Sequence, residues 1–201
     1  RDLHSFPTRR SSYLWQTAHL FILSGPAGAG KGTLRKRLCK AIPDLEFSVS
    51  CTTRPKRPNE EDGVDYCFVG EEVFDELVET DAFLEWAWVH DRRYGTKRAP
   101  VEEALLSGRD MVLEIDVQGA RRVSERLRNV VLIFIAPPSE ETLGNRLRGR
   151  GSETPEQLEL RLANARGELA QAGEYDHIVV NDDLDRAAKE LVRIVKGYRG
   201  K

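Results

Sequence analysis

Short apolar runs alternate with helix-like segments along most of the chain. The predicted strands are Leu20–Ser24, Phe47–Ser50, Met111–Asp116, Val130–Ala136 and His177–Val180. The predicted helices are Lys31–Ile42, Gln118–Arg128, Glu140–Arg148, Pro155–Ala172 and Leu184–Lys196. Runs such as "VVLIFIA" are almost continuously apolar, which is typical of strands covered by helices on both faces. Because strands alternate with helices, the pattern predicts an α/β fold with a parallel sheet flanked by helices.

The alternation changes between Cys51 and about Gly108. There "DYCFV" and "FLEWAWVH" are strand-like and flank the helical "EEVFDELVE", so we expect a small inserted α/β lobe at residues 51–108 and a core at 18–50 and 109–201. The segment "GRGSETPE" interrupts two helical stretches and indicates a short lid at about residues 140–160. The pattern before residue 18 is broken, and we expect residues 1–17 to be a disordered or extraneous extension outside the folded domain of residues 18–201.

Composition narrows the classes of partner. The chain has 201 residues, 40% of them hydrophobic and 32% charged, with a formal net charge of −2. A balance so close to neutral gives no reason to expect a nucleic-acid or membrane partner, and no apolar run reaches the roughly 20 residues that span a bilayer. Three cysteines without C-x-x-C spacing favour idle thiols in a reducing, cytoplasmic setting over zinc or disulfides. The oligomeric state stays open.

A glycine-rich segment, "GPAGAGKGT" at residues 25–33, follows the predicted strand "LFILS" and opens a predicted helix. Backbone N–H groups at such a turn converge on phosphate, and the helix dipole adds to the attraction. Spacing, lysine and context together argue against a chance glycine turn. Lys31 is predicted to bridge the outer phosphates of the donor. The predicted ATP-binding residues of this loop are Gly25, Pro26, Ala27, Gly28, Ala29, Gly30, Lys31, Gly32 and Thr33.

The loop departs from the common pattern at one position. Gly32 stands where Ser or Thr usually holds magnesium, and the hydroxyl follows at Thr33. The amides and Lys31 remain, and "GKGT" resembles the loop of adenylate kinases. We therefore predict no direct protein ligand to a metal: Mg²⁺ is carried by the ATP phosphates and by water. Glu114 or Asp116, two apart on the strand "MVLEID", is a candidate to position the ion through water.

A second anion site is indicated by "TTRPKRP". Arg54 and Arg57 each precede a proline, which favours extended backbone. With a period of about three residues, both guanidinium groups would project the same way and could grip one phosphate, with Tyr66 as a further donor. A solvated basic loop and an SH3-binding peptide remain alternatives for this stretch. The neighbouring phosphate loop favours the anion site.

Arginines near the predicted lid are candidates for stabilising charge during phosphoryl transfer. In "GNRLRGRG", Arg146 and Arg150 share a helical face, whereas Arg148 points elsewhere. Arg161 follows on the next helix. We assign Arg146, Arg150 and Arg161, with Lys31 and Arg54, as catalytic candidates that neutralise charge when the lid closes, although a solvated arginine-rich helix would look the same.

Taken together, these stretches carry a family likeness. From about Leu20 to about Tyr198 the chain resembles the guanylate kinase family, with matches at "GPAGAGKGT", "SVSCTTRPKRP", "GVDYCFV", "FLEWAWVH", "YGT", "LEIDVQGA", "IFIAPPS", "RLRGRGSET" and "IVVNDDLD". The resemblance implies a phosphate-loop core, an inserted GMP-binding lobe and an ATP lid. It also implies transfer of the γ-phosphoryl group of ATP to GMP, and to dGMP as well, within purine nucleotide metabolism.

The resemblance also implies roles for single residues. Asn181 would lie near the adenine ring, with Arg150 also on the ATP side, although Asn181 could be only a turn residue at a strand end. A carboxylate at Glu85 would accept from N1–H and N2 of guanine, whereas adenine offers a lone pair there. The implied GMP-binding residues are Ser50, Arg54, Arg57, Tyr66, Glu85, Tyr94, Thr96 and Asp116.

Three departures and two rival functions remain. Asn59 replaces a usual glycine, and Arg92 and Arg93 occupy a turn that more often holds Gly-Asn, where they could alter lobe closure or add positive charge near the GMP phosphate. With Gly32, they leave the rate and the magnesium dependence open. The rivals are a kinase for another nucleoside monophosphate and a catalytically silent module that binds phosphopeptides.

Overall fold

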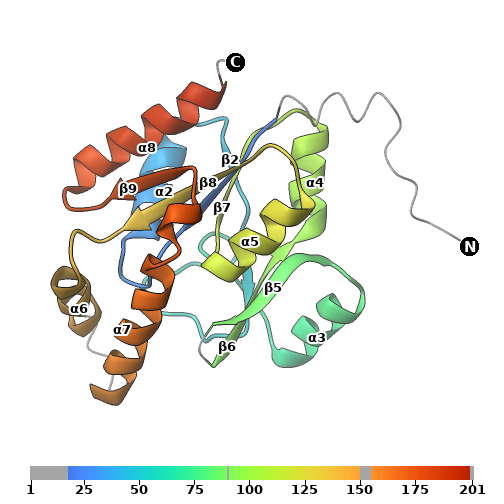
Figure 1. The fold of residues 1–201 in the computed structure, drawn as a ribbon. Helices are drawn as coiled ribbons and strands as arrows, with labels where there is room; N and C mark the ends of the chain where they lie inside the picture. Colours follow the sequence, from blue (N-terminus) through green and yellow to red (C-terminus); the bar gives the residue numbers. More distant parts are fainter. Residues whose placement is uncertain (1–17, 90, 150–154, 200–201) are drawn as a thin grey trace, which may run out of the picture. The chain divides into compact units, whose positions relative to one another are not determined.

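The computed structural model describes residues 18–89, 91–149 and 155–199. The expectations for residues 1–17, for Arg150 and for the centre of the lid lie outside the described residues. Within them, five strands form one sheet in the order β2-β7-β1-β8-β9 (Figure 1). These strands are β1 (Leu20–Ser24), β2 (Glu46–Phe47), β7 (Met111–Glu114), β8 (Val130–Ala136) and β9 (His177–Val180). The pairs β2–β7 and β8–β9 are parallel, which confirms the predicted α/β fold.

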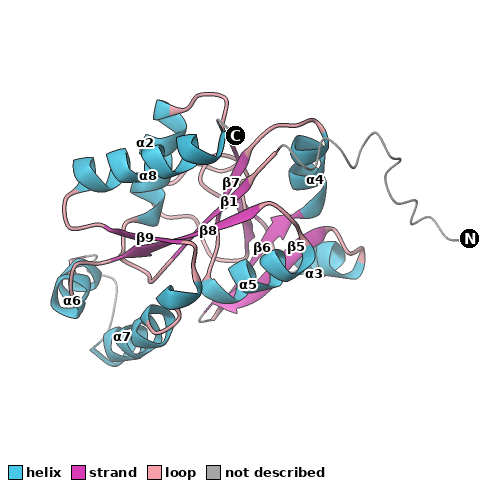
Figure 2. Ribbon diagram, turned by 45° about the horizontal axis from the view of Figure 1, so that its top comes forward, coloured by secondary structure: helices cyan, strands magenta, loops and turns pink. Residues whose placement is uncertain are grey.

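Helices cover the faces of this sheet, as Figure 2 shows. They are α2 (Lys31–Ala41), α5 (Val117–Arg126), α7 (Pro155–Leu169) and α8 (Leu184–Arg199), with a short 3₁₀ turn η1 (Ala172–Glu174). The helix α6 (Glu140–Arg148) packs against α7 instead. α2 packs against α8, and an ion pair joins Arg37 to Asp185. On another side, Val117 of α5 packs with Phe134 of β8 and Leu169 of α7. The near-continuous apolar pattern of β8 is thereby explained, since five of its seven residues are buried.

A second sheet has the order β4-β3-β6-β5. Its strands are β3 (Cys51–Thr52), β4 (Cys67–Phe68), β5 (Phe83–Val89) and β6 (Arg92–Lys97), and the segment also contains helices α3 (Glu71–Glu79) and α4 (Arg98–Leu106). β5 and β6 form an antiparallel pair, and Phe74 of α3 packs on Cys51 and Phe83 of the sheet.

β5 lies at the end of the strand order, so one of its edges has no strand partner within the described sheet. Arg126 donates to the carbonyl oxygen of Leu84 at 2.9 Å, and Arg122 donates to that of Trp86. Alternate carbonyls of this edge are therefore occupied by side chains of α5. A cavity of about 410 Å³ lies along the same strand.

The chain divides into two compact units. Of the described residues, one unit contains 18–20, 44–89, 91–113 and 122–130, and the other contains 21–43, 114–121, 131–149 and 155–199. The predicted lobe of residues 51–108 falls inside the first unit, and the glycine-rich loop lies in the second. The exact domain limits expected from the sequence stay a prediction.

Most predicted elements exist where the pattern placed them, and the differences have local causes. β1, β8, β9 and α6 have the predicted bounds. The strand predicted at Phe47–Ser50 is wrong beyond Phe47, because after Ser48 binds the Val112 carbonyl the chain leaves that sheet and enters β3. β3, β6 and α4 were not predicted: β3 is only two residues long, and the stretches "RRYGTK" of β6 and "RAPVEEALL" of α4 carry weak hydrophobic periodicity.

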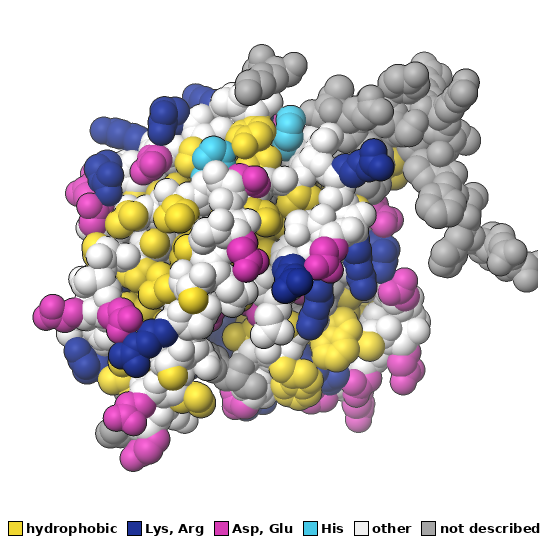
Figure 3. All heavy atoms as spheres, in the orientation of Figure 1, with side chains coloured by type: hydrophobic (Ala, Val, Ile, Leu, Met, Phe, Trp, Pro, Cys, Tyr) yellow, Lys and Arg dark blue, Asp and Glu magenta, His cyan; other side chains and the backbone are white. Residues whose placement is uncertain are grey.

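The surface agrees with the balanced composition. On the face drawn in Figure 3, basic and acidic side chains are interspersed. Among the described residues, none of the helices is both long and apolar enough to cross a bilayer.

Candidate nucleotide sites

The glycine-rich loop connects β1 to α2, as predicted. Gly30 is the N-cap of α2 with φ 91°, and no side chain caps the helix there. The first N–H groups of a helix have no partner within the helix, so this end of α2 presents donors that suit a phosphate. The loop itself is closed by a hydrogen bond from the Ala29 amide to the Pro26 carbonyl, at 3.1 Å.

Two glycines of the loop are required by their surroundings. Gly25 has φ 136°, and a Cβ there would lie 2.2 Å from the Ile135 carbonyl oxygen. At Gly30 a Cβ would lie 2.3 Å from Nδ2 of Asn181. That amide nitrogen donates to the Ala29 carbonyl at 2.7 Å, and Asn181 is buried. Asn181, predicted near the adenine ring, therefore braces the phosphate loop from the end of β9.

Lys31 lies at the loop with its ammonium group turned onto the loop backbone. Its Nζ donates to the carbonyl oxygens of Gly25 and Pro26, the latter at 3.2 Å. The charge of Lys31 acts on Glu168 of α7. Burial raises the pKa of Glu168, Lys31 lowers it in part, and the nearby Asp116 raises it further. The sequence analysis did not single out Glu168, because its proximity depends on how α7 packs.

Gly32 differs from Gly25 and Gly30 because it has room. A Cβ at Gly32 would meet only the Glu114 carboxylate oxygens, at 3.6 and 3.7 Å, which is ordinary contact. Glu114 accepts from Nε of Arg35 at 3.3 Å, and Arg35 is buried in α2. Gly32 thus lies beside an acidic side chain, and a serine would fit at this position without a steric clash.

The arginines predicted to act from the lid lie in three different situations. Arg146 of α6 donates from Nη2 to the Asn181 carbonyl at 2.9 Å, while its Nη1 is buried without a hydrogen-bond partner. An unpaired buried guanidinium nitrogen is costly, and a bound anion would satisfy it. Arg148 instead binds Asn145 on the exposed side, as the helical spacing predicted. Arg161 lies in α7, and Arg150 lies outside the described residues.

The second sheet has two chemically different faces. Residues of neighbouring strands that are paired in register point to the same face, and neighbours along a strand point to opposite faces. Cys51, Gly95 and Trp86 are in register on one face, which is covered by α3. The other face carries the pairs Thr52–Tyr94 and Glu85–Thr96. The predicted GMP-binding residues of these strands therefore share one polar face.

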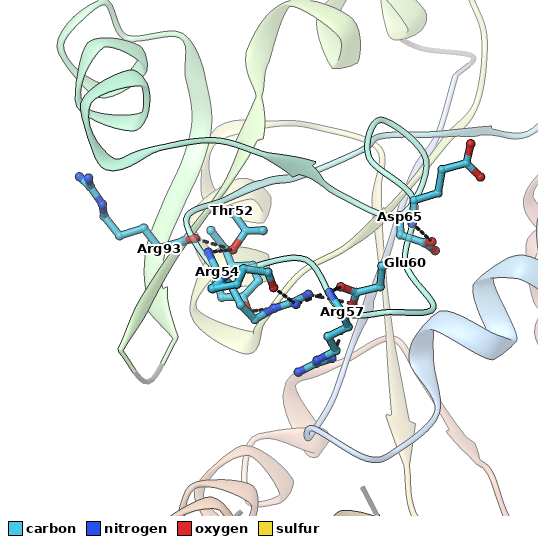
Figure 4. Close-up of polar contacts among 9 residues, drawn as sticks. Thr52, Arg54, Arg57, Glu60, Asp65 and Arg93 are labelled. Atoms are coloured by element: carbon cyan, nitrogen blue, oxygen red, sulfur yellow. Dashed lines mark hydrogen bonds and ion pairs between the residues drawn. The ribbon is translucent and has the colours of Figure 1, made fainter. Parts of the chain in front are cut away.

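Arg54 and Arg57 converge on one carboxylate, as Figure 4 shows. Nη1 and Nη2 of Arg54 donate to the two oxygens of Glu60 at 2.9 and 2.8 Å. The Arg57 amide also donates to Glu60, and its Nη1 lies 3.7 Å from Oε1. Burial alone would raise the pKa of Glu60, but the bonds from Arg54 and Arg57 outweigh it and lower that pKa. The two guanidinium groups thus converge on an anion, as predicted. That anion is the side chain of Glu60, which was not predicted to take part.

Two tyrosines complete this cluster. Nε of Arg54 donates to the Tyr94 hydroxyl at 3.2 Å, and the Arg54 guanidinium lies 5.4 Å from the ring centre of Tyr66. The Tyr66 and Tyr94 rings are in edge contact at 5.9 Å. Burial would lower the pKa of Arg54, yet its bonds to Glu60 and Tyr94 raise it. The structure therefore brings together four of the predicted GMP-binding residues.

Glu85 and Thr96 form a buried polar pair. Both side chains are buried, and Oγ1 of Thr96 donates to Oε1 of Glu85 at 2.7 Å. Ser50, also buried, directly precedes β3. A buried carboxylate needs hydrogen-bond partners, and Thr96 is one partner of Glu85.

The expectation that Arg93 adds positive charge near the GMP phosphate is wrong. Its guanidinium group binds Glu71 and Asp75 of α3 and lies 4.6 Å from the ring centre of Phe74. Figure 4 shows the side chain directed away from Arg54 and Arg57. The reason is strand alternation: Arg93 and Gly95 are two residues apart on β6, so both point to the face that α3 covers. Arg92 is half-exposed beside Asp91.

Asp116, predicted at the acceptor nucleotide, lies between β7 and α5, in the unit that holds the glycine-rich loop. Its Oδ1 accepts from the Gly119 amide at 2.9 Å, so it caps α5. Among the described residues, no group of three His, Cys, Asp or Glu is arranged to hold a metal ion. The Glu114 carboxylate beside the loop has the hard oxygen chemistry that suits magnesium reached through water.

The fold and these sites define a class: an α/β phosphate-loop protein with a separate anion-binding sheet face, built for nucleotides. Comparisons with known proteins narrow the class. The sequence profile of the family described as guanylate kinase matches residues 17–198. The chain is 51% identical to the guanylate kinase of Cutibacterium acnes, covering 87% of this chain and 88% of that protein.

Two further relatives agree. The identity to the guanylate kinase of Thermotoga maritima is 49%, over 90% of this chain and 88% of that protein. The crystal structure of guanylate kinase from Anaplasma phagocytophilum is similar with a TM-score of 0.78 and 32% identity, covering 92% of this chain and 88% of that one. The chain belongs to the guanylate kinase family, and it is an enzyme of that family.

Proposed function

We propose that this enzyme transfers the γ-phosphoryl group of ATP to GMP, giving ADP and GDP, and that it also accepts dGMP. The observation that carries the proposal is the polar face of the second sheet. That face carries the buried Glu85–Thr96 pair and Tyr94, and the Tyr94 hydroxyl accepts from Arg54, one of the two arginines after β3 that hold the Glu60 carboxylate. One feature suits a terminal phosphate and the other suits the donor edge of guanine.

Guanine selection rests on the buried carboxylate of Glu85. Thr96 donates to one of its oxygens, and because a carboxylate has several acceptor lone pairs, Glu85 is proposed to accept from N1–H and the N2 amino group of guanine as well. Adenine would set a lone pair against the carboxylate and leave it without those partners, which is a large penalty in a buried site. The Ser50 hydroxyl is proposed to donate to the O6 atom, while Thr96, whose single O–H is donated to Glu85, is proposed to orient that carboxylate against the base.

The phosphate of GMP is proposed to bind Arg54, Arg57, Tyr66 and Tyr94. The Glu60 carboxylate, now bound by both arginines, shows the geometry in which they hold an anion. A phosphate carries more charge than a carboxylate and offers three oxygens, so it matches paired guanidinium groups better. Asp116 is proposed to contact the acceptor nucleotide as well.

ATP is proposed to bind the loop of residues 25–33, with its phosphates on the backbone amides of the first turn of α2 and on the Lys31 ammonium. The unpaired Nη1 of Arg146 supports a role in binding the transferred group. Arg150 and Arg161 are proposed to add charge when residues 140–160 close as a lid. Asn181 holds the loop and is proposed to lie near the adenine ring.

In the reaction an oxygen of the GMP phosphate attacks the γ-phosphorus of ATP, and the bond to the β–γ bridging oxygen breaks with ADP as leaving group. No general base is required, because the attacking oxygen is already anionic. Alignment and charge neutralisation supply the catalysis. Mg²⁺ carried by ATP would neutralise part of this charge, and the Glu114 carboxylate would hold it through water.

The test is a comparison of kcat/KM for GMP, dGMP, AMP and UMP with ATP as donor. The proposal predicts GMP first and AMP lower by at least about 10³-fold. A preference for AMP would refute the role of Glu85. Absence of ADP formation with every acceptor would favour a silent binding module instead.

We also propose a setting for this activity. The substrates are small molecules, and the reaction belongs to purine nucleotide metabolism. The three cysteines are free, which agrees with a reducing, cytoplasmic compartment.

A further inference from the structure

Two of the three cysteines are neighbours in the second sheet. Cys51 of β3 and Cys67 of β4 are register partners in a parallel pair. The ladder on either side of them is intact, with the Cys67 amide bonded to the Ser50 carbonyl at 2.9 Å and Val69 to Thr52 at 3.0 Å. Directly paired residues have their side chains on one face, with strands about 4.8 Å apart. That spacing lies within the range of Cα separations that a disulfide spans.

The two thiols differ in environment. Cys51 is fully buried in the cluster with Phe74 and Phe83, and Cys67 packs against the same cluster while remaining partly exposed. The Lys97 ammonium lies 4.0 Å from the sulfur of Cys67. Burial raises the pKa of Cys51 to about 12, with the Cys67 thiol contributing. Reactive cysteines are typically partly exposed and next to a cation, which describes Cys67 and not Cys51.

We propose that Cys51 and Cys67 form a reversible redox modification site, in which a peroxide converts the pair to a disulfide. The Cys67 sulfur attacks the peroxide O–O bond, giving a sulfenic acid and water. The Cys51 sulfur then attacks that sulfenic sulfur and displaces a second water as the S–S bond forms. Two thiols are oxidised by two electrons while one hydrogen peroxide is reduced to two waters. An added dithiol reverses the step by exchange.

The position of the pair connects it to the GMP face. Ser50 and Tyr66 each directly precede one of the cysteines and lie on the opposite face. A disulfide requires a Cβ separation of about 3.8 Å, so closing it draws β4 roughly 1 Å toward β3 on the α3 side. Such a shift moves Tyr66 relative to Arg54, whose guanidinium lies over its ring. We therefore expect the disulfide to weaken GMP binding while leaving the ATP loop unaffected.

The chemical test uses the full chain treated with a small excess of hydrogen peroxide, then alkylated under denaturing conditions and digested with trypsin. Cleavage after Lys56 places Cys51 in residues 41–56 and Cys67 in residues 57–92, while Cys39 falls in a separate short peptide. The proposal predicts that the first two peptides are joined, with a mass about 2 Da below the sum of the two separate peptides. Dithiothreitol should separate them. Separate peptides, Cys67 oxidised only to sulfinic acid, or a link to Cys39 would each overturn it.

The kinetic test rests on the proposed function, whereas the peptide map does not. Peroxide is expected to raise the KM for GMP several-fold, with the KM for ATP unchanged and full recovery in dithiothreitol. Cys67→Ala and Cys67→Ser should abolish the response, and Cys39→Ala, on α2, should retain it. If the peptides are joined but no acceptor is phosphorylated before oxidation, the function fails and the site stands. If the Cys67 variants respond like the parent, the coupling to GMP is refuted.

Discussion

At the scale of single residues, one carboxylate organises the proposed phosphate site of Arg54 and Arg57. Glu60 holds Arg54 through two hydrogen bonds and keeps Arg57 within 3.7 Å. Two guanidinium groups side by side repel each other, and a shared anion offsets that repulsion. Glu60 is therefore a positioning residue in the protein without GMP.

The pKa of Glu60 makes this contribution pH-dependent. Because the folded protein lowers that pKa from its ordinary value of 4.5, the carboxylate stabilises the fold fully above pH 4.5 and progressively less as the pH falls through the lowered value. We expect Glu60→Gln to lower the free energy of unfolding by about 1 kcal/mol at pH 7, and the difference from the parent protein to shrink below pH 4.

Urea denaturation at a series of pH values measures this. Glu61→Gln, at the adjacent exposed position, is the matched control and should show no such trend. A difference for Glu60→Gln that grows toward acid pH would contradict the ion-pair explanation.

Base discrimination is also decided by one side chain. Glu85→Gln keeps the shape of the side chain and its contact with Thr96, but it replaces an acceptor oxygen by an amide donor facing guanine. We expect kcat/KM for GMP to fall by about 10²-fold or more, with the KM for ATP little changed. Steady-state kinetics with both substrates check this, and Glu102→Gln on the exterior of α4 serves as the control.

Retention of full GMP activity in Glu85→Gln would remove Glu85 from base recognition. The companion measurement is the ratio of GMP to AMP activity, which should fall in the variant. A lower rate with an unchanged ratio would indicate a structural effect instead.

At the scale of elements, the start of α2 depends on which glycine is replaced. Gly30→Ala places a Cβ 2.3 Å from the Asn181 amide in a backbone region that disfavours side chains, whereas Gly32→Ala meets only ordinary contacts. We expect Gly30→Ala to raise the Kd for ATP at least about tenfold. Gly32→Ala should bind ATP normally. Its free energy of unfolding should be higher by up to about 1 kcal/mol, because alanine favours helix over glycine.

Calorimetric ATP titration and thermal unfolding of the two variants, with Gly32→Ser as a third, measure these effects. The serine variant is expected to keep nucleotide affinity. A several-hundredfold gain in magnesium-dependent turnover for Gly32→Ser would show that the missing hydroxyl limits the present enzyme.

Local patterns were sufficient for some elements and insufficient for others. β8 and the loop before α2 could be predicted from the sequence, because continuous apolar character and glycine spacing are local signals. The convergence of Arg54 and Arg57 was also predictable, since it follows from two X-Pro steps. β6 was missed because its strand character comes from pairing with β5, and its Gly95 is required by the Phe83 ring above it. The direction of Arg93 depended on that same pairing.

At the scale of the whole molecule, the proposed acceptor and donor sites belong mainly to different compact units. Each should therefore respond to its own ligand. We expect GMP alone to slow amide hydrogen exchange in β3, β5 and β6, and a non-hydrolysable ATP analogue alone to slow it in residues 25–34. Amides of the first helical turn should respond most, because phosphate would bind them directly.

Exchange measured by mass spectrometry on the two binary complexes checks this, with α4 as an internal reference. Protection of residues 25–34 by GMP alone would contradict the assignment of the loop to ATP.

The side chains that cover the open edge of β5 have a consequence for handling and storage. Arg122 and Arg126 occupy carbonyls that a strand from another molecule would need in order to add to the sheet. Two cationic groups at that border also repel the same border of a second copy. The enzyme should accordingly resist aggregation through this edge at high protein concentration. Replacing both arginines by alanine would leave the edge of β5 open to strand pairing between molecules.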